Sequence, residues 1–138
     1  MMRLTRRYRF AALHRLHSPH LSEEENRALY GKCAHPYGHG HDYVLEVTVR
    51  GPVDPLSGRV ANTRALDSLV AAEVLGPLSH QELNAVLAAV PTTENLARAI
   101  RERLLDGWPR VFPGPHPRLE RVRLAETPRN IIEITEVL

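Results

Sequence analysis

The feature that most constrains this chain is the stretch of residues 33–43, which reads CAHPYGHGHDY and runs directly into the apolar segment Val44–Val49. The Val and Thr residues of that segment favour a β-strand. Side chains two positions apart on an extended backbone point to the same side, so His39 and His41 can aim both imidazoles at one point, and Gly40 leaves that approach uncrowded. A third imidazole beside this pair would make an open catalytic zinc site. A lone His-x-His is more often a turn whose histidines face solvent, and the rest of the chain has to decide between the two interpretations.

The overall composition predicts one globular domain spanning residues 1–138, with 43% hydrophobic and 25% charged residues. The net charge of +2 comes from scattered arginines, and no basic run interleaves with aromatic residues, so we expect no nucleic-acid partner. The one cysteine cannot form an internal disulfide, which favours a reducing compartment. We find no apolar stretch long enough to span a bilayer and no signal-peptide core, so we expect a cytoplasmic protein without a membrane partner.

Hydrophobic periodicity and turn residues divide the chain into strands and helices. The predicted elements are a strand over Leu4–Ala12, a short helix between Ser22 and Gly31, the His-Gly-His strand through Val49, turns over Gly51–Gly58 that close a hairpin onto a candidate return strand at Arg59–Asn62, a helix from Asn62 to Gly76-Pro77, a polar loop over Leu78–Asn84, a helix from Thr92 to Asp106-Gly107, a strand over Leu119–Glu126, and a final strand over Ile131–Val137. This order predicts an α+β fold with an antiparallel four-stranded sheet and two helices on one face. Such a sheet leaves two open edges, which edge-to-edge oligomerisation would close.

Polar chemistry is available at four places along this arrangement. They are His14 at the end of the first apolar strand face, Cys33 with His39 and His41, the pair Ser79-His80 in the polar loop, and Glu126 at a strand end. Each has an ordinary alternative when read alone. A histidine such as His14 can be a satisfied core residue, Cys33 can be a small buried hydrophobe, and Glu126 can be a solvated carboxylate.

Together, and in this order, these residues resemble the 6-pyruvoyltetrahydropterin synthase family, which also contains the 6-carboxytetrahydropterin synthases of queuosine biosynthesis. The resemblance covers nearly the whole chain and runs through Phe10–Leu16, Leu21–Asn26, Tyr30–Cys33, Gly38–Tyr43, Asp54–Gly58, Leu78–Asn84, Thr92–Asn95 and Glu126-Thr127. It implies the tunnelling fold, in which sheets of several subunits close into an oligomeric barrel. The family usually forms a homohexamer of two stacked trimers, with its active sites at subunit interfaces.

The resemblance also implies an activity and a role for each site residue. The implied enzyme is a carbon–oxygen lyase that converts 7,8-dihydroneopterin triphosphate to 6-pyruvoyltetrahydropterin with loss of triphosphate, a step of tetrahydrobiopterin biosynthesis. Its zinc ligands would be His14, His39 and His41; its catalytic groups Cys33 as general base, His80 in proton transfer and Glu126 as pterin anchor; and its substrate-binding segment Thr92, Thr93 and Glu94. Zinc is inferred from the ligand type, since imidazole also suits iron, nickel or copper.

One departure from the family pattern bears on the reaction. Ser79 stands where the family usually has an aspartate, and a serine carries no charge to stabilise an imidazolium. A catalytically weakened pterin-binding homologue is therefore one alternative, and a 6-carboxytetrahydropterin synthase is another. The long spacer Ala34–Gly38 and Asn62 favour the 6-pyruvoyl branch. An unrelated structural-zinc protein is disfavoured, because such sites are usually closed by four ligands rich in cysteine.

Overall fold

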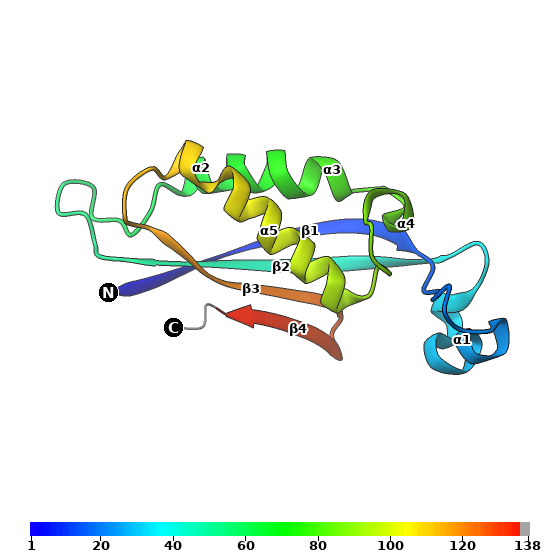
Figure 1. Ribbon diagram of the computed structural model, residues 1–138. Helices are drawn as coiled ribbons and strands as arrows, with labels where there is room; N and C mark the ends of the chain where they lie inside the picture. The colour runs from blue at the N-terminus through cyan, green and yellow to red at the C-terminus, as the bar shows by residue number, and fades with distance from the viewer. Residues whose placement is uncertain (136–138) are drawn as a thin grey trace.

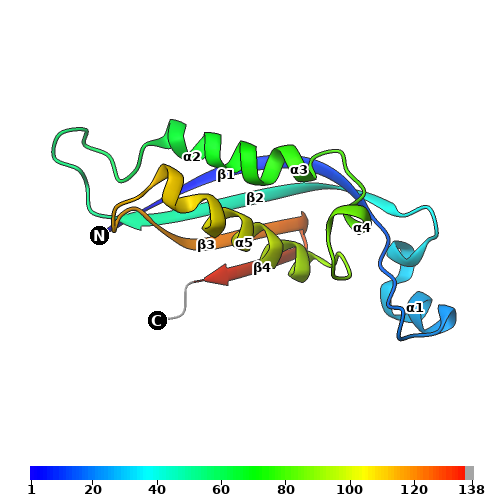
Figure 2. The ribbon, with the colours of Figure 1, turned by 45° about the horizontal axis from the view of Figure 1, so that its top comes forward.

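The computed structural model describes residues 1–135 and shows one antiparallel sheet with helices packed along one of its faces (Figures 1 and 2). The sheet order is β1-β2-β3-β4. The elements are β1 (Met2–His14), α1 (Glu23–Tyr30), the 3₁₀ turn η1 (Gly31–Ala34), β2 (His39–Gly51), α2 (Thr63–Val70), the π-helical turn η2 (Ala71–Leu75), α3 (Gly76–Leu78), α4 (Leu83–Val86), α5 (Thr93–Val111), β3 (Arg118–Thr127) and β4 (Asn130–Thr135). The predicted α+β class and the four-stranded antiparallel sheet are confirmed. The last two positions of the predicted strand Ile131–Val137 lie outside the described residues.

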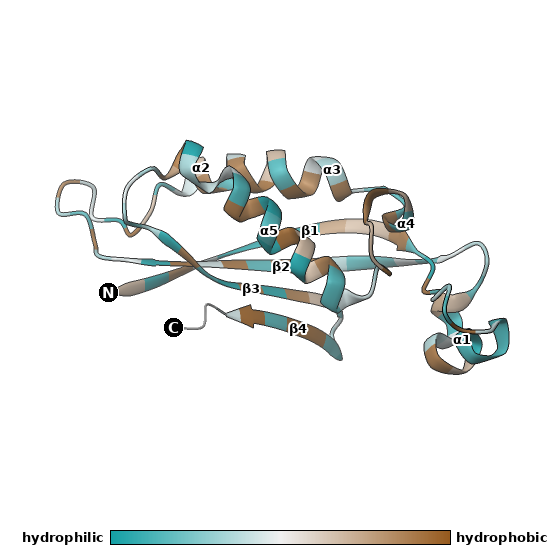
Figure 3. Ribbon diagram, in the orientation of Figure 1, coloured by the Kyte–Doolittle hydropathy of each residue, from teal (hydrophilic) through white to brown (hydrophobic). Residues whose placement is uncertain are grey.

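The core lies between the sheet and the two long helical segments. Alternation places Tyr43, Leu45, Val47 and Val49 of β2 on the helix-covered side, where each is fully buried. They pack in one cluster with apolar residues of α2 and α5, and the alternating hydropathy of strands and helices is visible in Figure 3. The other face of the sheet carries arginine, glutamate and threonine side chains.

Three side-chain caps begin the helices where the sequence predicts. Ser22 and Glu25 form a reciprocal capping box at the start of α1. The Asn62 side chain accepts a hydrogen bond from the Ala65 amide at 3.0 Å at the start of α2, and Thr92 accepts one from Asn95 at 3.1 Å at the start of α5.

The region after β2 differs from the prediction. The turn over Gly51–Gly58 is present, but it does not close a hairpin, and Arg59–Asn62 forms no strand. The Asp54 amide donates to the carbonyl of Arg59 at 2.9 Å, which closes a local turn, and the chain then enters α2. The predicted return strand was wrong because the sheet's second neighbour on β2 is the distant strand β3.

Both long helices extend beyond their predicted ends. The first continues through η2 into α3 and ends at Leu78, because the chain widens into a π-turn ahead of Pro77, which has no amide hydrogen to donate. α5 passes through Gly107, where an added Cβ would lie 2.8 Å from Leu69 Cδ1, so this glycine permits close helix packing and does not end the helix. The predicted polar loop over Leu78–Asn84 also contains the start of α4, which buries Leu83.

Within residues 1–135 we find no helix whose length and apolar character would let it cross a membrane.

Candidate metal centre and active site

Four side chains from four separate segments meet at one end of the sheet. One ligand atom from each of His14, Cys33, His41 and Glu126 lies within 4.8 Å of the others. The Nε2 atoms of His14 and His41 are 3.1 Å apart, and the Cys33 Sγ lies 3.4 Å from the first and 3.9 Å from the second. Two imidazole nitrogens, a thiol and a carboxylate form a donor set that suits zinc and related divalent cations.

Strand register brings the two histidines together. His14 pairs with His39 across β1 and β2, and His41 pairs with Ala12, so His14 and His41 are diagonal neighbours on the helix-covered face. The His14 ring is buried, and its Nδ1 donates to the Pro91 carbonyl at 3.0 Å. A carbonyl can only accept, so the proton sits on Nδ1 and the lone pair of Nε2 faces the other three groups.

Cys33 reaches the group from η1, the turn between α1 and β2. Its carbonyl accepts a hydrogen bond from the Leu16 amide at 2.6 Å, which ties the turn to the segment that follows β1. Burial, with a further contribution from the Glu126 carboxylate, raises the pKa of the Cys33 thiol. The neighbouring Lys32 is exposed, and the net effect of the surroundings favours the protonated thiol.

Glu126 closes the group from the end of β3. Its Oε1 lies 2.8 Å from His41 Nε2, while its Oε2 accepts hydrogen bonds from the Thr93 hydroxyl and from Asn130 Nδ2, the latter at 3.0 Å. Thr93 is the first residue of α5 and is buried. One carboxylate oxygen is therefore held by the protein, and the other faces the cluster.

Burial is also the largest influence on the two histidines. It lowers the pKa of both His14 and His41, against the opposing effect of the Glu126 carboxylate. Both imidazoles are thereby kept neutral near pH 7, and a neutral imidazole is the form that binds a metal ion.

Comparison with known proteins shows which family has this sequence and fold. A sequence model of the 6-pyruvoyl tetrahydropterin synthase family matches residues 3–137. The chain belongs to the 6-pyruvoyl tetrahydropterin synthase family. It is 42% identical over 133 residues to the 6-pyruvoyl tetrahydrobiopterin synthase of Poecilia reticulata, covering 94% of this chain and 86% of that protein. It is 40% identical over 133 residues to the enzyme of the same name from Homo sapiens, covering 94% and 88%.

A solved structure of the family shares the whole fold. The Caenorhabditis elegans 6-pyruvoyl tetrahydropterin synthase superposes with a TM-score of 0.86 at 36% identity, covering 99% of this chain and 96% of that one. The Plasmodium falciparum 6-pyruvoyl tetrahydropterin synthase, at 14% identity and a TM-score of 0.70, is similar in fold alone. The subunit therefore has the tunnelling fold of this family.

The remaining predicted site residues of this 6-pyruvoyl tetrahydropterin synthase homologue lie around the group. His39 is outside the four-residue group, but its ring contacts that of His41 edge to face with centroids 4.6 Å apart. Thr92 uses its hydroxyl to cap α5, and Glu94 is exposed in the first turn of that helix. Of the predicted substrate segment, Thr93 alone touches the group within residues 1–135.

His80 approaches from the outer edge of β1. Its amide donates to the Ala11 carbonyl at 2.6 Å, and its backbone is left-handed, with φ 60°. Together with His41 it lines a hollow of about 370 Å³, while within residues 1–135 no hydrogen bond joins it to Cys33. A non-glycine residue held in this backbone region is common at functional sites.

Three positioning residues escaped the sequence analysis of this 6-pyruvoyl tetrahydropterin synthase homologue. Tyr43 places its hydroxyl 3.3 Å from His14 Nδ1, Pro91 supplies the carbonyl that fixes the same ring, and Asn130 holds Glu126. Tyr43 could have been found, because it lies two residues after His41 on the same strand face. Pro91 and Asn130 act through long-range contacts that no local pattern reveals.

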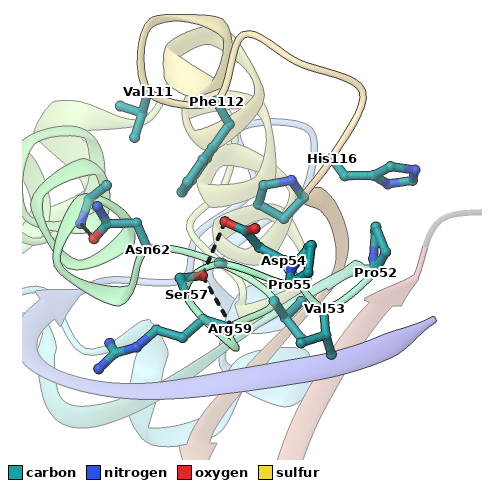
Figure 4. A pocket seen from close by; sticks show the side chains of 14 residues that line it. Pro52, Val53, Asp54, Pro55, Ser57, Arg59, Asn62, Val111, Phe112 and His116 are labelled. Atoms are coloured by element: carbon teal, nitrogen blue, oxygen red, sulfur yellow. Dashed lines mark hydrogen bonds between the residues drawn. The ribbon is translucent and has the colours of Figure 1, made fainter.

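A larger hollow lies elsewhere, at the far end of β2. It measures about 810 Å³ and is lined by the loop after β2, by Val111 at the end of α5, and by Phe112 and His116 of the segment that follows α5 (Figure 4). The Asp54 carboxylate there accepts from the Leu56 amide and from the Ser57 hydroxyl, at 3.0 and 3.2 Å. The Asp54 carboxylate is thus used to shape the turn, and none of the four cluster residues lines this hollow.

Proposed function

We propose that this protein is a metal-dependent pterin synthase that converts 7,8-dihydroneopterin triphosphate to 6-pyruvoyltetrahydropterin with loss of triphosphate. The observation that carries the proposal is the convergence of His14, Cys33, His41 and Glu126 in a chain of this family. The relatives from Poecilia reticulata and Homo sapiens bear the 6-pyruvoyl name, which favours this branch over the 6-carboxytetrahydropterin synthases.

We propose His14, His39 and His41 as the ligands of a zinc ion. They come from two adjacent strands, share one face, and include a directly opposed pair, His14 and His39. Three imidazoles leave open coordination positions, as catalytic zinc sites do. A divalent cation bound there supplies Lewis-acid polarisation of substrate oxygens and a positive charge that favours a nearby thiolate.

We assign proton transfer and pterin binding to side chains of the protein. Cys33 is the general base that removes a proton from the substrate side chain, and His80 takes part in proton transfer. Glu126 accepts hydrogen bonds from the amino and ring N–H groups of the pterin, while Thr93 and Asn130 hold its second oxygen. Thr92 and Glu94 complete the proposed substrate segment beside Thr93.

We also propose that the protein forms a homo-oligomer. The outer edge of β1 over Met2–Phe10 and the outer edge of β4 have no strand neighbour among the described residues. Pairing of such edges between copies would close the sheets into a barrel, which we propose to be a hexamer of two trimers in the cytoplasm.

The alternative of a weakened homologue rests on Ser79, which replaces a carboxylate next to His80. If the missing charge limits proton transfer, Ser79→Asp raises the elimination rate. An unchanged or lower rate with purified protein would count against that explanation, and Ser79→Asn serves as the uncharged control.

The deciding experiment is incubation of the purified protein with 7,8-dihydroneopterin triphosphate, with and without a chelator. Mass spectrometry of the product distinguishes 6-pyruvoyl- from 6-carboxytetrahydropterin. We expect the 6-pyruvoyl product, lost on chelation and restored by zinc. Metal content without either product would support the non-catalytic alternative.

A further inference from the structure

The face of the sheet opposite the helices carries an unusual concentration of guanidinium groups. Three glutamates on this face form ion pairs with five arginines, which leaves an excess of positive charge. The arginines are Arg3, Arg7, Arg50, Arg121 and Arg123, and the glutamates are Glu46, Glu120 and Glu133.

Strand register sets like charges directly opposite one another on this face. Arg3 of β1 pairs with Arg50 of β2, an arrangement that destabilises a sheet unless an anion lies between the two side chains. The bulge in the β2–β3 pairing turns Glu120 toward both of them, and this single carboxylate accepts from Arg3 and lies 3.6 Å from Arg50 Nη1. One carboxylate neutralises two guanidinium groups only in part.

These residues border a hollow of about 440 Å³ on the open face. It is lined by three arginines, two glutamates and three threonines, and the hydroxyls of Thr5 and Thr48 lie 2.8 Å apart and hydrogen-bond to each other, which leaves one of the two protons for another acceptor. Arginine forks bind phosphate groups bidentately, and threonine hydroxyls can donate to the same oxygens.

A second observation points to a missing acceptor. The Nε of Arg121 is buried and has no hydrogen-bond partner among the described residues. The Nη1 and Nη2 atoms of the same side chain lie 3.1 Å from Glu133 and 3.8 Å from Glu46. The guanidinium group is thus held in place while its Nε–H has no acceptor among the described residues. A buried N–H without an acceptor destabilises the fold, and an oxyanion that reached this nitrogen would supply the missing acceptor.

We infer that this hollow binds a linear polyphosphate anion through Arg3, Arg50 and Arg121. The choice of polyphosphate over a single phosphate rests on the proposed function, whose reaction releases triphosphate, and on the spread of the three arginines over three strands. The site is separate from the histidine cluster, since the two share no residue.

Isothermal titration calorimetry with inorganic triphosphate tests the inference, using the full-length protein. Arg50→Gln removes a charge, and Arg121→Lys keeps the charge but removes the open Nε donor. We expect each to weaken binding about tenfold, the loss that one charge-assisted hydrogen bond predicts. Arg64→Gln, on the exposed side of α2 across the sheet, is the matched control and should bind like the wild type.

The outcomes separate this inference from the proposed function. No binding, or binding that is equal in wild type, Arg50→Gln and Arg121→Lys, would overturn it. An ATP arm identifies the source: equal affinity means that the phosphate chain alone is recognised, and weaker ATP binding assigns the site to free triphosphate. Turnover of the pterin substrate is measured on the same samples. Turnover without triphosphate binding at this hollow would contradict only the anion site. Triphosphate binding without turnover would contradict only the proposed pterin synthase activity.

Discussion

The two faces of the sheet differ in how their polar side chains are arranged and paired. On the helix-covered face, the polar atoms of His14, His41 and Glu126 are gathered at one end, largely buried, and held by specific partners. On the open face, arginines and glutamates form a broad ionic surface in which one carboxylate serves several cations. Glu46 is itself buried on the open face, so the difference lies in the partners: each group of the cluster has a few specific, mostly buried contacts, whereas each open-face carboxylate is shared by several partly exposed arginines.

The largest expected effect comes from removing a ligand on the covered face. His41→Ala takes away the nitrogen that faces His14, Cys33 and Glu126. Because changes to groups that merely support a metal ligand lower affinity 10–100-fold, we expect at least a roughly 100-fold loss of zinc affinity and of turnover. Metal analysis and product formation measure both.

A matched control asks whether Cys33 is a ligand or a base. Cys33→Ala should retain zinc and lose turnover if the three histidines hold the ion. Loss of zinc together with turnover would instead place the thiol among the ligands.

The next effect contrasts adjacent residues that point to the two faces. Leu45 is fully buried against the helices, whereas Val44 is half-buried on the open face. We expect Leu45→Ala to lower the free energy of unfolding by about 2–5 kcal/mol and Val44→Ala by about 1 kcal/mol or less. Urea denaturation measures both, and similar losses would show that the open face is equally packed in the oligomer.

A smaller effect tests how Glu126 is positioned. Thr93→Val keeps the size of the buried side chain but removes the hydroxyl that donates to Glu126. Loss of one hydrogen bond to a carboxylate predicts about a tenfold fall in kcat/KM for the pterin. Thr93→Ser should restore most of it, and failure of serine to do so would indicate that Thr93 acts through packing.

The smallest effect is a pH dependence on the open face. The hydrogen bond from Arg3 is the main reason that the pKa of Glu120 lies below its ordinary value of 4.5. A lowered folded-state pKa contributes stability above pH 4.5 that is lost as pH falls through the folded-state value.

Glu120→Gln should therefore be less stable than wild type at neutral pH by a small margin that closes under acid conditions. Thermal unfolding at several pH values measures that margin. Glu102→Gln on the exposed side of α5 is the control, and a gap that widens in acid would contradict the assignment.

Local patterns predicted much of this molecule because their causes are local. Alternation located the strands, and the caps Ser22, Asn62 and Thr92 began three helices as expected. Gly107 and Pro77 misled the prediction of helix ends, since packing against Leu69 and a π-turn override the usual stop signals. The pair His39 and His41 was found because a two-residue repeat orients side chains whatever the fold.

What the sequence alone determined is the set of reactive side chains and the face on which each strand presents them. The family resemblance assigned Cys33 and Glu126 to one active site with His14 and His41. Only the tertiary structure showed how closely these four side chains meet, that Pro91 sets the His14 tautomer, and that Arg3 opposes Arg50. These contacts join segments far apart in the chain. Their geometry depends on strand register and helix packing, which the whole core fixes at once.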